Sequence, residues 1–392
     1  MDPRINPYAP GAGYPPPELA GRDDIVERAS IALNRIKAGR PSRSMIFYGL
    51  RGVGKTVLLN KVRLDAEAQE IATVHIEAPE GKSLPAALLP SLRSTLIKLS
   101  RMEAMKAGFS GVLRTVSGLA RALKIKYEDI EIGLDGGDDG PGGTGDLETD
   151  LVDLLDTVGR AAKAQKTAII ILIDELQYIR EEQLGSLIAA LHRANQNQLP
   201  VALFAAGLPQ LLGLAGRARS YAERLFEYVP IDQLDEEAAR LALCRPAERE
   251  NVAFAEGAVA EIIQQTHGYP YFLQEWGKHS WDLARSSPIT QQDAEAATAA
   301  ALAELDASFF RVRFDRLTPA EKRYLRAMAE LGAGPHRSGD IAEKLGRPVT
   351  TVAPTRNSLI AKGMLYSPSH GDTAFTVPLF DGFMKRIMAF PF

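Results

Sequence analysis

Apolar residues along this chain recur in two patterns that predict different elements. Short, almost uninterrupted apolar runs are typical of strands buried on both faces of a sheet, and they occupy residues 44–48, 72–76, 168–173, 200–205 and 227–231. Longer segments repeat apolar residues every three or four positions, as helices do, at 25–36, 57–64, 147–162 and 184–193. Because strands and helices alternate, we predict an α/β fold with a doubly wound parallel sheet.

The remaining pattern divides the 392 residues into further parts. We expect an α/β core over 19–232 with an insertion at about 84–146, and a helical lid and connector over 233–316. The insertion predicts helices at 84–100 and 102–123, a short hairpin at 125–132 and a Gly- and Asp-rich loop at 135–145.

The two ends of the chain differ from its middle. Residues 1–18 form an arm rich in proline and glycine, which is either disordered or an extended strap packed on the body. From Thr318 to the end, ten Lys and Arg face six Asp and Glu, whereas the whole chain has a net charge of −3. A basic end on an acidic body suggests that residues 317–392 are a separate domain that meets nucleic acid or an acidic partner.

Composition limits the class of protein. A hydrophobic content of 45% and a charged content of 24% are typical of a soluble globular protein. The single cysteine, Cys244, excludes an intrachain disulfide and suits a reducing compartment. The longest strongly apolar run, 168–173, is far shorter than the roughly 20 residues of a membrane-spanning helix, so we expect a cytoplasmic protein without membrane contact.

A glycine-rich segment, GLRGVGKT at 49–56, directly follows the first strand and precedes a helix. Glycines let backbone N–H groups approach phosphates closely, and the helix N-terminus adds a favourable partial positive charge. Lys55 would reach the terminal phosphates and Thr56 would join the magnesium shell. The predicted nucleotide-binding residues of this loop are Gly49, Gly52, Val53, Gly54, Lys55, Thr56 and Val57.

Two acidic residues follow the strand at 168–173. Carboxylates at the C-terminal end of a parallel strand lie at the crevice where ligands bind. Asp174 is expected to hold Mg²⁺ together with Thr56, and Glu175 to orient or deprotonate an attacking water. A binding site needs only the first acid, so the pair predicts hydrolysis as well as binding.

The combination of GLRGVGKT with IIILIDELQ resembles AAA+-like ATPases of the origin-recognition type, whose bacterial and archaeal relatives grade into the signalling STAND ATPases. The resemblance covers about residues 18–285 and implies ATP and Mg²⁺ as ligands. Segment 20–23 looks like the family's "GRxxE" box, which places Gly21 and Arg22 near the adenine. Segment 266–271 looks like the "GxP" signature of the lid, which places Gly268 and Pro270 against the nucleotide.

The resemblance also implies an arginine that contacts the γ-phosphate, from the same chain or from a neighbour. Segment 220–226 looks like the arginine segment of this class and makes Arg224 the candidate, with Arg217 and Arg219 as rivals. A contact from a neighbour would require a homo-oligomer.

This sequence departs from the family in two places. The fourth strand ends in Gly207-Leu208-Pro209, where relatives place a polar sensor residue, and no second-sensor arginine is visible in the lid. Both departures favour slow turnover and the STAND-like branch.

The C-terminal segment predicts a winged helix-turn-helix. Helices are expected at 319–331, 338–345 and 348–362, followed by strands at 363–366 and 374–377 around a wing at 367–371. In this fold the third helix enters the major groove of DNA. The predicted DNA-binding residues are Arg347, Thr351, Thr355, Arg356 and Lys362.

Two functions therefore compete. The first is a slow ATPase whose nucleotide state controls binding of double-stranded DNA. The second is a STAND-like regulatory switch whose winged helix docks a protein partner or drives self-association.

Overall fold

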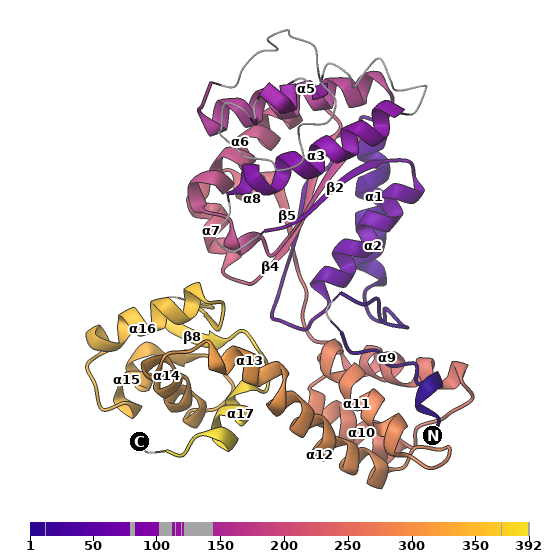
Figure 1. Cartoon of the computed structure of the whole chain (residues 1–392), viewed down its shortest axis with the longest axis vertical. Helices are drawn as coiled ribbons and strands as arrows, with labels where there is room; N and C mark the ends of the chain where they lie inside the picture. The colour runs from indigo at the N-terminus through magenta and orange to yellow at the C-terminus, as the bar shows by residue number, and fades with distance from the viewer. Residues whose placement is uncertain are drawn as a thin grey trace.

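The computed structural model describes residues 1–11, 13–78, 83–101, 112–113, 115–118, 120, 144–369 and 371–390. The chain forms an α/β core, a helical lid and a C-terminal domain, which are arranged as three lobes (Figure 1). The predicted hairpin at 125–132 and most of the predicted helix at 102–123 and loop at 135–145 lie outside the described residues.

The core contains one five-stranded sheet of order β2-β3-β4-β1-β5 in which every neighbouring pair is parallel. The strands are β1 (Ser44–Tyr48), β2 (Ala72–Glu77), β3 (Ile169–Asp174), β4 (Val201–Gly207) and β5 (Phe226–Pro230). Each lies within one or two residues of its predicted range. The doubly wound parallel sheet is therefore confirmed.

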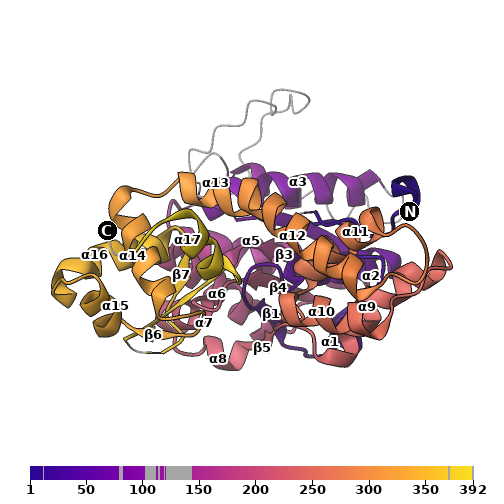
Figure 2. The same ribbon diagram turned by 90° about the horizontal axis from the view of Figure 1, so that it is seen from below.

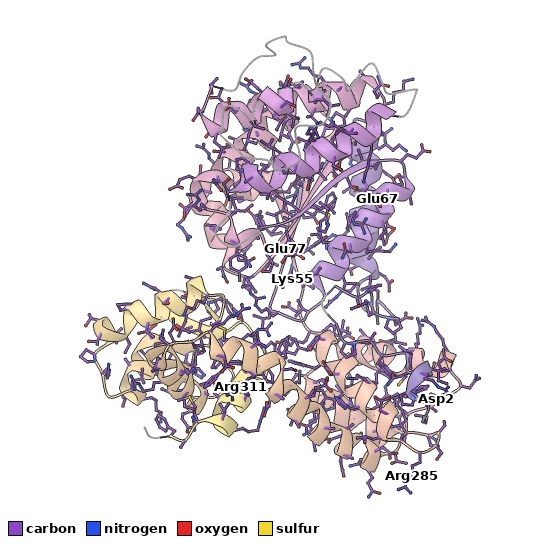
Figure 3. The ribbon with its side chains drawn as sticks, in the orientation of Figure 1. Asp2, Lys55, Glu67, Glu77, Arg285 and Arg311 are labelled. Atoms are coloured by element: carbon purple, nitrogen blue, oxygen red, sulfur yellow. The ribbon has the colours of Figure 1, made fainter. Side chains whose placement is uncertain are left out.

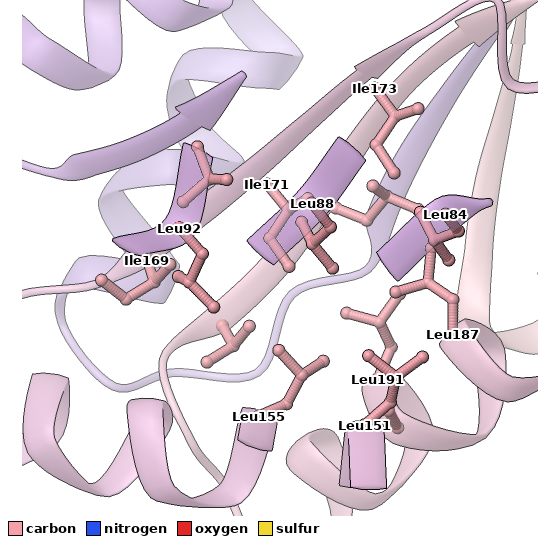
Figure 4. Packing of buried hydrophobic residues seen from close by; sticks show 14 of the residues in the cluster. Leu84, Leu88, Leu92, Leu151, Leu155, Ile169, Ile171, Ile173, Leu187 and Leu191 are labelled. Carbon is pink, nitrogen blue, oxygen red and sulfur yellow. The ribbon is translucent and has the colours of Figure 1, made fainter. Parts of the chain in front are cut away.

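Helices cover both faces of this sheet because successive residues of each strand point to opposite sides. Ile170 and Leu172 of β3 pack with α1 (Asp23–Lys37) and α2 (Lys55–Ala68). Ile169, Ile171 and Ile173 pack on the other face with leucines of α3 (Leu84–Arg101), α5 (Leu147–Ala164) and α6 (Glu181–Gln196), as Figure 4 shows. Three short helices complete the core: η2 (Leu176–Tyr178), α7 (Leu211–Ala218) and α8 (Ala222–Leu225).

The lid follows β5 and consists of four helices, α9 (Glu236–Arg249), α10 (Glu256–Thr266), α11 (Pro270–Leu283) and α12 (Gln291–Ala307). Pro270 begins α11, where its missing N–H costs nothing. A further helix, α13 (Phe309–Asp315), connects the lid to the C-terminal domain (Figure 2).

The C-terminal domain contains the three predicted helices, α14 (Pro319–Glu330), α15 (Ser338–Lys344) and α16 (Val349–Ala361). Its antiparallel sheet has the order β6-β8-β7, with β6 (His336–Arg337), β7 (Leu365–Tyr366) and β8 (Asp372–Phe375). This arrangement is consistent with a winged helix. Strand β6 and a final helix, α17 (Phe380–Ile387), were not predicted.

Part of the N-terminal arm packs on the lid. It opens with a short helix, η1 (Pro3–Ile5), and the ring of Tyr8 is only 4% exposed. The indole of Trp281 donates a hydrogen bond to the Asp2 carbonyl over 2.9 Å, and the Asn6 amide donates to the Lys278 carbonyl over 3.1 Å. The described arm residues therefore form a strap, and the lid is the surface that holds it.

Hydrophobic packing groups the lobes into two bodies. One buried cluster runs from the lid through Phe310 and Phe314 of α13 into α14, α16 and α17. We call the lid, α13 and the C-terminal domain together the distal body. The α/β core has its own two clusters, one on each face of the sheet. Within the described ranges, no helix combines the length and apolar character needed to cross a bilayer.

Candidate functional site

The glycine-rich loop connects β1 to α2 at the carboxyl edge of the sheet. Gly52 and Gly54 have φ angles of +82° and +93°, which L-residues with side chains rarely adopt. A Cβ on Gly49 would lie 2.0 Å from the Ile231 carbonyl oxygen, so this position also requires glycine. The loop therefore has the tight backbone that a phosphate-binding loop needs.

Lys55 is the first residue of α2, and its side chain folds back against the preceding loop. Its side chain is 8% exposed, and its Nζ donates to the carbonyl oxygens of Gly49 and Leu50 over 3.0 and 2.7 Å. Burial lowers the pKa of Lys55 to about 8, against the raising effect of Glu175 and Asp174. A phosphate placed in the loop would raise this pKa again, because an anion favours the charged ammonium.

Thr56 and Asp174 meet although they lie 118 positions apart. The Thr56 hydroxyl donates to Oδ2 of Asp174 over 2.6 Å, and the backbone N–H of Glu175 donates to Oδ1 over 2.8 Å. A hydroxyl and a carboxylate oxygen are ligands that Mg²⁺ prefers. The donor set therefore fits a magnesium ion shared with a phosphate. Glu77, which pairs with Asp174 across the β2–β3 ladder, is a further carboxylate at this edge and was not predicted.

Glu175 has an unusual backbone and two side-chain partners. Its φ of +52° lies in the left-handed region, which costs a non-glycine residue about 1 kcal/mol or more. Its Oε1 lies 3.6 Å from Nη1 of Arg51, and its Oε2 accepts a hydrogen bond from Nε2 of Gln177. Its carboxylate is thus held at the cavity from two sides.

These residues line a cavity of about 540 Å³ between the α/β core, the lid and α13. Figure 3 shows Lys55 and Glu77 at this end of the sheet. The volume falls within the roughly 300–1,000 Å³ range of small-molecule sites. The wall facing the loop comes from distant parts of the chain, namely the arm (Ala9, Pro10, Gly11, Gly13, Tyr14, Pro16), α11 (Pro270, Tyr271, Gln274) and α13 (Phe309, Arg313).

Most of the predicted nucleotide-binding residues line this cavity: Arg22, Gly52, Val53, Gly54, Lys55, Thr56, Val57 and Pro270. Gly21 and Gly268 instead permit close packing at its border. Their added Cβ atoms would lie 2.6 Å from Ala238 Cβ and 2.4 Å from the Leu234 carbonyl oxygen. Arg22 is buried and donates to the carbonyl oxygens of Val53 and Asp232.

The predicted catalytic arginine lies elsewhere. Arg224 is exposed on α8, and the described residues that line the cavity do not include it. Its rivals are engaged, because Arg217 pairs with Glu181 and Arg219 pairs with Glu148. Contact between Arg224 and a nucleotide would therefore need a neighbouring copy.

Arg313 of α13 is an arginine of the cavity that the sequence did not reveal. Its Nη1 donates to the Phe309 carbonyl over 2.6 Å, and its guanidinium lies 4.0 Å from the centre of the Phe309 ring. Burial and then the nearby charge of Arg51 lower the pKa of Arg313 to about 10. Two cations held close together favour an anion between them.

The predicted DNA-binding residues on and beside α16 fall into two groups. Arg347 and Thr351 are exposed near the start of the helix, and Thr355 is half-buried. Arg356 donates to the Thr373 hydroxyl, the Ser367 hydroxyl and the Asp372 carbonyl, and Lys362 pairs with buried Glu321 over 2.7 Å. Arg356 and Lys362 therefore stabilise the domain itself. His370 of the predicted wing lies outside the described residues.

A second polar cluster lies in the lid, where ligand atoms of Glu275, His279 and Glu304 are within 4.8 Å of one another. Nζ of Lys278 also lies 3.3 Å from both Glu304 oxygens. Because a cation of the protein already faces this carboxylate, we interpret the group as an ion-pair cluster.

Comparison with known families gives two matches. Residues 18–204 match the AAA ATPase domain family, and residues 307–384 match a family described as Domain of unknown function (DUF8462).

A curated relative is an uncharacterized HTH-type transcriptional regulator, MJ0774, of Methanocaldococcus jannaschii. It is 24% identical over 237 residues, which are 58% of this chain and 56% of that protein. The chain thus spans little more than half the length of this relative.

Solved structures are similar over nearly the whole chain. The Walker-type ATPase PABY2304 of Pyrococcus abyssi gives a TM-score of 0.57 at 17% identity, over 93% of this chain and 96% of that chain. The Orc1 protein of Aeropyrum pernix in complex with DNA gives a TM-score of 0.49 at 15% identity, over 95% and 94% of the two chains. The first of these likenesses shows the fold.

Proposed function

We propose that this protein binds ATP with Mg²⁺, hydrolyses it slowly and uses its nucleotide state to control DNA binding, because residues 18–204 match the AAA ATPase domain family. The cavity between the α/β core and the distal body is the proposed ATP site. The loop N–H groups and Lys55 would hold the phosphates, and Thr56 and Asp174 would hold the metal ion. Magnesium, when bound, neutralises charge on the phosphates.

Glu175 is the proposed catalytic residue for hydrolysis. Its carboxylate lines the cavity beside Asp174, where it can orient a water molecule and accept its proton. Two features support slow turnover. Strand β4 ends in Gly207 without a polar side chain, and Arg51 already faces Glu175 over 3.6 Å.

A contact between the C-terminal domain and the phosphate loop carries the proposal of nucleotide control. The backbone N–H of Arg51 donates to the carbonyl of Thr376 over 3.0 Å. At Gly363 an added Cβ would lie 3.2 Å from Nη2 of Arg51 and 3.0 Å from the Tyr178 hydroxyl. The domain thus rests on the loop that would hold the phosphates, and α13 brings Arg313 into the same cavity. A change of nucleotide alters the surface on which the domain rests.

The start of α16 is the proposed DNA contact. Lys344 and Arg347 are exposed around the turn between α15 and α16, and Arg337 is exposed at the start of α15. Thr350 and Thr351 are exposed on the first turn of α16. In helix-turn-helix proteins the N-terminal residues of the recognition helix reach the base edges. The relative from Methanocaldococcus jannaschii, described as an HTH-type transcriptional regulator, supports the same assignment.

The second candidate is a STAND-like switch whose C-terminal domain docks a protein or a second copy of this chain. Val349 at the start of α16 is 45% exposed, which suits an apolar contact. Arg356 and Lys362 are already engaged within the domain, which leaves fewer cations for phosphates. The exposed Arg224 would complete the ATP site of a neighbour in such an assembly.

Duplex DNA binding, measured by fluorescence anisotropy with ATP, ADP or no nucleotide over a range of salt concentrations, separates these functions. The first function predicts an affinity that depends on nucleotide and falls with salt. Arg347→Ala should reduce the slope of log affinity against log salt by about one. Lys385→Ala removes the same charge from an exposed position of α17 and should leave the slope unchanged. Absence of binding at low salt, with an ATP-dependent increase of mass in solution, favours the second function.

Hydrolysis is tested by Glu175→Gln. Loss of the base should lower turnover by roughly 10²- to 10⁴-fold while ATP still binds. Asp65→Ala is the control, because Asp65 pairs with Lys61 on the outer face of α2. Equal turnover in wild type and Glu175→Gln would exclude the proposed role of Glu175.

A further inference from the structure

Strand β4 ends in Gly207, the position where the ATPases that this chain resembles carry a polar residue. A polar group nevertheless reaches this position from the neighbouring strand connection. Gln177 lies in η2, just beyond β3, and its Oε1 accepts a hydrogen bond from the backbone N–H of Leu208 over 3.0 Å. The end of β4 therefore has a carboxamide beside it, although its own sequence does not provide one.

The partners of Gln177 fix the orientation of its amide. The N–H of Leu208 can only donate, so the oxygen of the Gln177 amide must face β4. Nε2 then points away from β4, and it donates to Oε2 of Glu175. A single side chain thus joins the main chain of β4 to the carboxylate that would activate water.

Gly207 is the other half of this arrangement. A Cβ at this position would lie 2.6 Å from Oε1 of Gln177, closer than such atoms approach in proteins. Any residue larger than glycine would therefore push Gln177 from its hydrogen bond with Leu208. The absence of a side chain at Gly207 and the position of the Gln177 side chain therefore depend on each other.

We infer that Gln177 is a positioning residue that sets the place of the Glu175 carboxylate, in the role of the absent polar residue of β4. This inference rests on the proposed hydrolysis by Glu175. Without Gln177, the remaining side-chain partner of Glu175 among the described residues is Arg51, at 3.6 Å. The ion pair with Arg51 would draw the Glu175 carboxylate toward the loop and away from the position of the attacking water.

Single-turnover hydrolysis and ATP affinity of Gln177→Ala test the inference. Turnover should fall by roughly 10- to 100-fold while the dissociation constant for ATP stays within about twofold of wild type. Gln183→Ala is the matched control, because Oε1 of this buried glutamine also accepts a backbone N–H, that of Leu84, over 2.9 Å, but lies outside the cavity. It should hydrolyse ATP at the wild-type rate.

Two further variants distinguish positioning from a structural role. Gln177→Glu keeps an oxygen that can accept the N–H of Leu208 but loses the amide that donates to Glu175, so turnover should fall as it does in Gln177→Ala. Gly207→Ala should lower turnover in the wild-type background but lower it less in the Gln177→Ala background. In that background Gln177 is no longer there to be displaced, and only Leu211, whose Cδ2 would lie 2.9 Å from the new Cβ, must shift.

The inference is overturned if Gln177→Ala hydrolyses ATP as wild type does, or if it loses ATP affinity and turnover together. Additive losses in the Gly207→Ala double variant would also overturn it. These results presuppose wild-type turnover. A wild-type protein that binds ATP without hydrolysing it contradicts the proposed hydrolysis itself, and the role of Gln177 with it.

Discussion

The α/β core and the distal body are each stabilised by apolar packing inside, whereas the junction between them is largely polar. The core has apolar clusters on both faces of its sheet, and the distal body has one cluster that continues from the lid into the C-terminal domain. Among the described residues, Tyr269 packs against clusters of both bodies. Elsewhere their meeting place holds Lys55, Glu175, Arg51 and Arg313 around a cavity. A polar junction of this kind is completed by a ligand more than by packing.

The largest expected effect comes from removing Lys55, the main cation on the side of the cavity formed by the α/β core. Lys55→Ala should weaken ATP binding by about 100-fold, because a charge-assisted contact to phosphate is lost inside a buried loop. It should also abolish the rise in melting temperature that ATP gives the wild-type protein. Lys61→Ala, on the same helix but paired with Asp65, should bind ATP normally. Titration calorimetry measures both variants, and tight binding by Lys55→Ala would show that this side of the cavity is not the phosphate site.

The next effect is a pH dependence. The folded-state pKa of Lys55 is about 8, below its ordinary value of 10.5, so the unfolded chain binds more protons between these values. The contribution of Lys55 to the stability of the free protein is therefore complete above about pH 10.5 and is lost as the pH falls toward 8.

ATP binding has the opposite dependence, because phosphate requires the charged ammonium. The dissociation constant should rise by about tenfold per pH unit above pH 8. Calorimetry at pH 8.5 in buffers of different ionisation enthalpy should show proton uptake on binding. A dissociation constant that stays flat from pH 7 to 9.5 would contradict this account of Lys55.

A smaller effect is expected from removing Arg313, on the side of the cavity formed by the distal body. Arg313 lies close to Arg51, and Arg51 faces Glu175, so this positive pair lies on the hydrolysis side of the cavity. Arg313→Ala should weaken ATP by about tenfold and ADP by less than about threefold. Arg311→Ala is the control, since this arginine of α13 is exposed and pairs with Asp315 (Figure 3). Equal weakening of ATP and ADP would show that the distal body does not distinguish them.

The smallest effect concerns the contact of the C-terminal domain with the loop. Gly363→Ala would press a Cβ against Arg51 and Tyr178. The variant should therefore have a larger radius of gyration, measured by small-angle scattering. The nucleotide dependence of its DNA binding should change by about threefold. Gly371→Ala has similar backbone strain, with φ of +85° against +65°, but meets no atom within 4 Å. If the two variants behave alike, the contact at Gly363 does not transmit the nucleotide state.

The sequence predicted those features that depend on residues close together along the chain. The five strands, the loop and the acids Asp174 and Glu175 follow from short contiguous patterns, and the structure places them at one edge of the sheet. Strand β6 has only two residues and α17 has eight, which is too short for a reliable period.

Other residues depend on contacts across long stretches of chain. Arg313 enters the cavity because α13 crosses to the core, and Gln177 reaches Leu208, 31 positions away. Arg356 occupies an outward position by helical spacing, yet its long side chain reaches back to Thr373 and Asp372. A one-dimensional pattern records none of these distances. The sequence therefore predicted the loop and the two acids after β3, and Pro270 through the family resemblance, but it did not predict Arg313.

The hydrogen bond between Arg51 and Thr376 joins two main-chain groups, so side-chain substitution does not remove it directly. A bond of this kind contributes about 1 kcal/mol net, which changes the ratio of attached to detached molecules by roughly fivefold. A ligand of ordinary affinity can offset a contribution of this size. Reciprocity then follows from thermodynamics: the factor by which ATP changes the affinity for DNA must equal the factor by which DNA changes the affinity for ATP.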